Sequence, residues 1–133
     1  MKKFTNQFVI CAILLTGLVF IASSCKKDKT PDRDKFLGAY SVVETCGSGN
    51  DTYDLTILES GTSENAIIVA NLYGSGTQLS ATVSGSNVTI ASQVALGITW
   101  SGSGSISGNT LTISFMVSAG GASDNCTALC TRK

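Results

Sequence analysis

From Phe36 to the end of the sequence, apolar and polar side chains alternate with a period of two. This alternation is typical of β-strands that bury one face, and no long stretch has the period of an amphipathic helix. Short Gly, Ser and Asn clusters interrupt it, and those at Ser84–Asn87 and Ser107–Asn109 have the composition of tight turns. The pattern predicts an all-β domain with eight strands near 36–46, 51–59, 65–73, 77–84, 87–92, 95–106, 109–118 and 122–132.

Most of these strands are apolar on one face and rich in Thr, Ser and Asn on the other. One-sided burial in sequential strands with short turns predicts an antiparallel meander that closes on itself as a small eight-stranded barrel. Exposed strand edges are often protected by charged side chains, but no Asp, Glu, Lys or Arg lies between Asn65 and Ser123. Closure of the barrel would protect these edges instead. The alternative fold is an immunoglobulin-like β-sandwich. The expected inner face comprises Phe36, Gly38, Tyr40, Val42, Tyr53, Leu55, Ile57, Leu79, Ala81, Val83, Val88, Ile90, Leu96, Ile98, Trp100, Leu111, Ile113, Phe115 and Val117.

The N-terminal segment has the pattern of a secretion signal. A basic start, Met1–Lys3, precedes an apolar run over 8–22, which is shorter than the roughly 20 residues that span a bilayer. The run ends in Ile21–Cys25, which resembles the lipobox of bacterial lipoproteins. That resemblance implies cleavage after Ser24 and lipidation of Cys25. The alternatives are an uncleaved N-terminal anchor or cleavage at an ordinary signal-peptidase site.

The residues that follow Cys25 are charged and contain the only proline. Residues 25–35 are therefore expected to form a flexible, lipidated tether, and residues 36–133 the folded domain, after a signal peptide over 1–24. Lys26 occupies the position at which an Asp often retains a bacterial lipoprotein in the inner membrane. The resemblance therefore implies a lipid-anchored protein of the cell envelope at the outer membrane, and leaves open which way it faces.

The start of the expected domain adds a second resemblance. Phe36–Val42 contains Gly-x-aromatic at Gly38–Tyr40, as at the start of the first strand in lipocalin-like barrels. Together with the lipobox and the closing segment Ser123–Thr127, it makes the whole chain similar to the short lipocalin-like lipoproteins of Bacteroidota-type bacteria. The resemblance implies a lipocalin-like barrel.

Three cysteines remain once Cys11 is removed with the signal peptide and Cys25 is lipidated. In a closed barrel the first and last strands are antiparallel neighbours, and a register that places Cys46 opposite Cys126 places Cys130 opposite Val42. We expect a Cys46–Cys126 disulfide, as secretion permits, with Cys130 a small buried side chain. Pairing of Cys46 with Cys130 is the structural alternative.

The composition argues against several functions. The chain has no histidine, the commonest general base and metal ligand, and its nine basic residues balance nine acidic ones. We therefore expect no enzyme activity, no metal, no cofactor and no nucleic-acid partner. The expected partners are membrane lipid, through acylated Cys25, and either an envelope protein or a small apolar ligand.

Two functions remain open. The first, which we favour, is a membrane-anchored, non-enzymatic module whose barrel is filled by side chains and has a structural or protein-interaction role. The second is a carrier of a small apolar ligand. Glu44 shares the parity of the inner face, so it either points into the barrel or, as we prefer, sits in water at the rim. The candidate ligand-lining residues are Tyr40, Glu44, Tyr53, Trp100 and Phe115.

Overall fold

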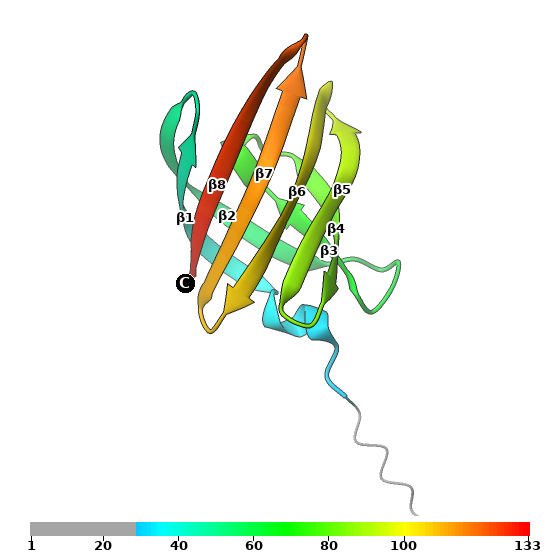
Figure 1. Cartoon of the computed structure of the whole chain (residues 1–133). Coiled ribbons are helices and arrows are strands. Elements are labelled where there is room, and N and C mark those ends of the chain that lie inside the picture. The colour runs from blue at the N-terminus through cyan, green and yellow to red at the C-terminus, as the bar shows by residue number, and fades with distance from the viewer. Residues whose placement is uncertain (1–28) are drawn as a thin grey trace, which may run out of the picture.

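The computed structural model describes residues 29–133 and is a closed barrel in which each strand pairs with the next and β8 pairs with β1 (Figure 1). The predicted eight-stranded antiparallel meander, a lipocalin-like barrel, is therefore confirmed, and the sandwich alternative is wrong. The expected signal peptide and Cys25 lie outside the described residues. The elements are η1 Asp32–Lys35, β1 Gly38–Cys46, β2 Gly49–Glu59, β3 Ala66–Ala70, η2 Leu72–Gly74, β4 Gln78–Ser84, β5 Asn87–Ala95, β6 Ile98–Ser107, β7 Thr110–Ala119 and β8 Ala122–Arg132.

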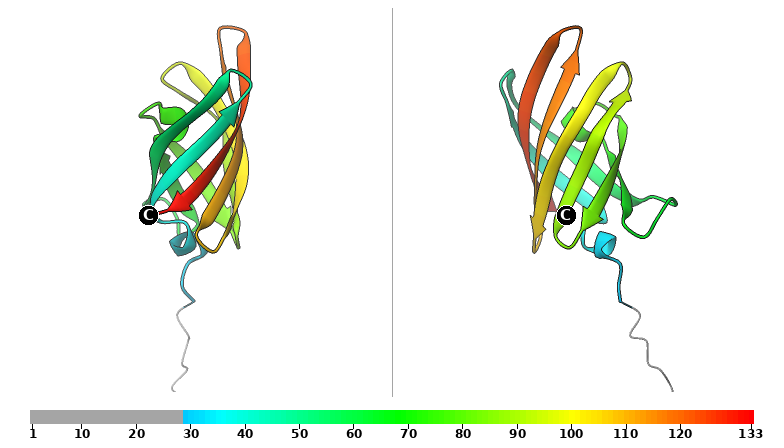
Figure 2. Two further views of the ribbon diagram at one scale, coloured as in Figure 1. Left: turned by 90° about the vertical axis from the view of Figure 1, so that its left-hand side faces the viewer. Right: turned by 45° about the vertical axis from the view of Figure 1, so that its right-hand side comes forward.

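The two ends of the barrel differ in what covers them. At the η1 end lie the short helix η1, the turns 60–65, 85–86 and 108–109, and the C-terminus (Figures 1 and 2). The opposite end, here called the mouth, is formed by the turns 47–48, 96–97 and 120–121 and by the η2 segment, 71–77. Among residues 29–133 no helix has the length and apolar character needed to cross a membrane.

One cluster of buried side chains runs through the interior, as expected for a filled barrel. It contains most of the predicted inner-face residues. Leu96 is a correction, because it lies in the turn between β5 and β6 with φ of 53° and is 78% exposed. The third strand is also shorter than expected, since it ends at Ala70 and the chain then turns into η2.

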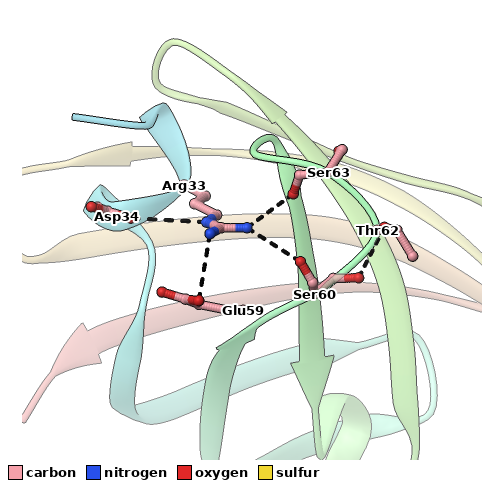
Figure 3. Close-up of polar contacts among 6 residues, drawn as sticks. All are labelled: Arg33, Asp34, Glu59, Ser60, Thr62 and Ser63. Carbon is pink, nitrogen blue, oxygen red and sulfur yellow. Dashed lines mark hydrogen bonds and ion pairs between the residues drawn. The ribbon is translucent and has the colours of Figure 1, made fainter. Parts of the chain in front are cut away.

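The tether differs from expectation in its last residues, because η1 is folded against the barrel. Arg33 donates from Nη1 to the backbone oxygens of Ser60, at 3.2 Å, and Ser63, at 2.9 Å (Figure 3). Its Nη2 lies 3.4 Å from Oε2 of Glu59. On the other side of η1, Asp32 accepts a 2.8 Å bond from the backbone N–H of Gly85. The sequence suggests that these charged side chains are solvated. In the structure they form hydrogen bonds with backbone groups of two barrel turns, so the ordered unit begins before Phe36.

Candidate functional site

The disulfide is where the sequence predicts it. Cys46 and Cys126 are directly opposite in the β1–β8 ladder and are bonded to each other, and Val42 faces Cys130. Cys130 is free and buried. Burial, and secondarily the charge of Glu44, raises the pKa of the Cys130 thiol to about 12. Since the thiolate is the reactive form, Cys130 is an unreactive core residue.

Glu44 points into the barrel and is only 2% exposed, so its preferred placement in water at the rim is wrong. The Tyr53 hydroxyl donates a hydrogen bond to Oε2 of Glu44 and accepts one of 2.9 Å from the backbone N–H of Tyr73. Burial raises the pKa of Glu44, although the bond from Tyr53 opposes this effect. Glu44 and Tyr53 thus connect the barrel wall to η2.

The second carboxyl oxygen of Glu44 faces the disulfide. Oε1 lies 3.3 Å from Sγ of Cys46, but a disulfide sulfur has no proton to donate. The contact is therefore favourable when Glu44 is protonated, in agreement with its raised pKa. Glu44, Cys46 and Cys126 also place three potential metal ligands within 4.8 Å. Because both sulfurs are bonded to each other, they are not available as the thiolates that a metal requires.

Three aromatic rings pack together below the mouth. The Tyr73 ring meets Trp100 and Phe115 edge to face, with centroids at 6.3 and 6.2 Å, and Trp100 stacks with Phe115 at 6.5 Å. The indole N–H of Trp100 is 3.3 Å from the backbone oxygen of Ala95. Tyr73 reaches this position with φ of 63°, which is unusual for an aromatic residue.

Tyr40 lies apart from this group, at the η1 end. Its hydroxyl donates a 2.7 Å bond to the backbone oxygen of Phe36, and the Arg132 guanidinium lies over its ring at 5.0 Å. Four of the predicted lining residues therefore lie near one another, because Tyr73 contacts Tyr53 on one side and Trp100 and Phe115 on the other, and Tyr53 contacts Glu44. Tyr40 does not lie beside them. The predicted lining set is divided between the two ends of the barrel.

A hollow of about 470 Å³ opens at the mouth. One carboxylate faces it, that of Asp124, whose Oδ2 accepts hydrogen bonds from the hydroxyls of Ser48 and, at 3.3 Å, Tyr73. None of the five predicted lining residues borders the hollow; Trp100 and Phe115 lie behind Tyr73, which does. The hollow is lined by Gly47, Ser48, Tyr73, Ile98, Val117, Ser118, Ala119, Ala122, Ser123 and Asp124.

Tyr73 and Asp124 are absent from the sequence-based site. A signal for Asp124 was present, because it lies two residues before Cys126 and therefore shares its face of β8. For Tyr73 the Gly74–Gly76 cluster indicates a turn. It does not indicate that the ring folds back over the barrel end.

No protein-family model, curated protein or solved structure matches this chain.

The raised pKa of Glu44 predicts how the stability of the barrel depends on pH. A folded-state pKa above the unfolded value means that the folded protein binds more protons, so stability falls as pH rises from about 4.5 through the folded-state pKa. We expect Glu44→Gln to remove this loss, so that the variant gains stability relative to wild type as pH rises. Urea unfolding followed at several pH values measures this difference.

The matched control is Glu64→Gln, which changes an exposed residue of the same type. Its stability difference from wild type should stay constant over the same pH range. A constant difference for Glu44→Gln as well would show that folding does not raise the pKa of Glu44.

Proposed function

We propose that this protein is a non-enzymatic lipoprotein of the cell envelope, anchored in the outer membrane by acyl chains on Cys25. In this proposal the barrel is a structural or protein-interaction module held at the membrane surface. The resemblance of Ile21–Cys25 to a lipobox supports the anchor. The absence of histidine from the sequence, together with an interior filled by apolar side chains, supports a role other than catalysis.

The observation that carries the proposal is the lipobox-like Ile21–Cys25, and the docking of η1 by Arg33 and Asp32 indicates how the anchored barrel would be oriented. The docking fixes the point at which the chain joins the barrel, and only residues 26–31 separate Cys25 from η1. Six residues span at most about 20 Å, so an acylated Cys25 would hold the η1 end close to the lipid surface. The mouth would then face away from the membrane, accessible to a partner.

Mass spectrometry of the mature N-terminus tests the anchor. In a bacterial host that processes lipoproteins, wild-type protein from the membrane fraction should begin at Cys25 and carry fatty acyl chains such as palmitate. Cys25→Ala should abolish both the acyl mass and cleavage after Ser24. Cys11→Ala, which changes a cysteine within the apolar run, should have no effect. An unmodified Cys25 in the membrane-extracted protein would refute the proposal.

A second candidate function is favoured by the hollow at the mouth. Its volume of about 470 Å³ falls in the range of small-molecule sites, and it borders the Tyr73 ring. In this alternative the barrel carries a small ligand at its mouth rather than in its interior. Binding of small aromatic probes at the mouth distinguishes a ligand carrier from a purely structural or protein-interaction module.

A further inference from the structure

The mouth hollow combines an apolar wall with a carboxylate. Tyr73, Ile98 and Val117 form the apolar part, and Asp124 and Ser48 the polar part. Trp100 and Phe115 pack against the Tyr73 ring, and the Tyr53 hydroxyl accepts a hydrogen bond from the backbone N–H of Tyr73. The wall is therefore a packed, preformed surface against which the apolar body of a small ligand can lie.

The cations of the described residues are confined to one end of the barrel, whereas acidic residues lie at both ends. The mouth has two solvent-facing acids, Asp51 and Asp124, and no cation among the residues that the structure describes. All cations of this part of the chain lie at the other end, in or beside η1 or at the end of β8. They are Lys29, Arg33, Lys35, Arg132 and Lys133. The electrostatic complement of the mouth is a positive charge.

Asp124 is the acid that meets the hollow, and its neighbours keep it ionised. The hydrogen bond from the Ser48 hydroxyl is the main cause that lowers the pKa of Asp124, and the Tyr73 hydroxyl adds to it. The ion pairs found within residues 29–133 do not include Asp124. It therefore presents an uncompensated negative charge beside an apolar wall.

We propose that the mouth hollow binds a small molecule with an apolar body and one protonated amine, the amine next to Asp124 and the body against Tyr73 and Ile98. This inference rests on the second candidate function, ligand binding at the mouth, and is independent of the lipid anchor. A carboxylate ligand would be repelled, and an alcohol of the same shape would gain only the apolar contact.

Three probes of one shape test the charge preference: phenethylamine, phenethyl alcohol and hydrocinnamate. The full chain in phosphatidylcholine vesicles is titrated with each at neutral pH, and the fluorescence of Trp100, the only tryptophan, is recorded. Trp100 contacts Tyr73, so a ligand in the hollow should change its emission. We expect the amine to bind about tenfold more tightly than the carboxylate, with the alcohol between them.

Asp124→Asn should reduce the affinity for the amine to that for the alcohol, and Asp51→Asn is the matched control. Asp51 is an acid of the same barrel end that does not line the hollow, so its variant should keep most of the preference. Equal affinity of wild-type protein for amine and carboxylate would overturn the inference but leave the carrier function standing. No fluorescence change with any probe would overturn both. Should Asp124→Asn fail to fold, weakening of wild-type amine binding by added salt supports the inference, and salt independence overturns it.

Discussion

Loss of the Cys46–Cys126 disulfide is expected to lower the free energy of unfolding by about 4 kcal/mol. The bond joins residues separated by 80 positions and therefore restricts nearly the whole unfolded barrel domain. It also joins the first and last strands, so that closure of the barrel is covalent at the mouth. Urea unfolding of Cys46→Ser/Cys126→Ser, followed by Trp100 fluorescence, measures the effect.

Cys130→Ala is the control, because it removes a buried sulfur without removing a crosslink. We expect it to cost about 1 kcal/mol, the value of one small buried group. A dithiol reductant should bring wild-type protein to the stability of the double variant and leave the double variant unchanged. If the double variant unfolds at the same urea concentration as wild type, the β1–β8 ladder alone closes the barrel.

The disulfide was predictable because two simple constraints act on the same residues. Closure of a meander makes β1 and β8 neighbours, and strand parity then limits which residues can face one another. Cys46 and Cys126 satisfy both constraints, and the observed register places Cys130 opposite Val42 as expected. Most strand limits follow from the Gly and Asn turns in the same way.

The mouth was harder to predict, because its geometry depends on contacts between distant segments. Residues 65–73 are apolar on both faces, so no alternation shows where β3 ends. Asn71 instead redirects the chain: its side-chain amide donates a 2.7 Å bond to the backbone oxygen of Asp54, and its Oδ1 accepts a 2.8 Å bond from the N–H of Gly76. Those bonds bring Tyr73 over the barrel end.

Glu44 and Arg33 show the same limit for charged residues. Composition suggests that isolated charges are solvated, and both side chains are instead largely removed from water. Glu44 is covered once Tyr53 and η2 lie over it, and Arg33 once the turn after β2 supplies backbone oxygens. Alternation does place Glu44 and Tyr53 on the inner face, but it does not show that η2 covers Glu44 or that the turn after β2 meets Arg33, because those contacts join distant segments.

At two glycines of β6 the neighbouring strand β7 leaves no room for a Cβ. Gly102 pairs with Phe115 and Gly104 with Ile113 in the β6–β7 ladder. A Cβ at Gly104 would overlap the backbone oxygen of Thr112 and lie 3.0 Å from Cα of Ile113. These are backbone atoms of a paired strand, so no flexible side chain can move aside. The absence of a side chain at Gly104 thus permits the close approach of β6 and β7.

Gly104→Ala is therefore expected to destabilise the barrel by about 3 kcal/mol, at the upper end of the usual cost of overpacking. For a domain of this size the melting temperature should fall by more than about 10 °C. Gly61→Ala is the matched control, because a Cβ there meets no atom within 4 Å and its backbone is not in the left-handed region, so stability should change by less than about 0.5 kcal/mol. Circular dichroism melts of both variants provide the comparison. Equal melting temperatures for the two would mean that β6 and β7 can separate at Gly104 without loss of stability, and would refute close strand approach as the reason for glycine at this position.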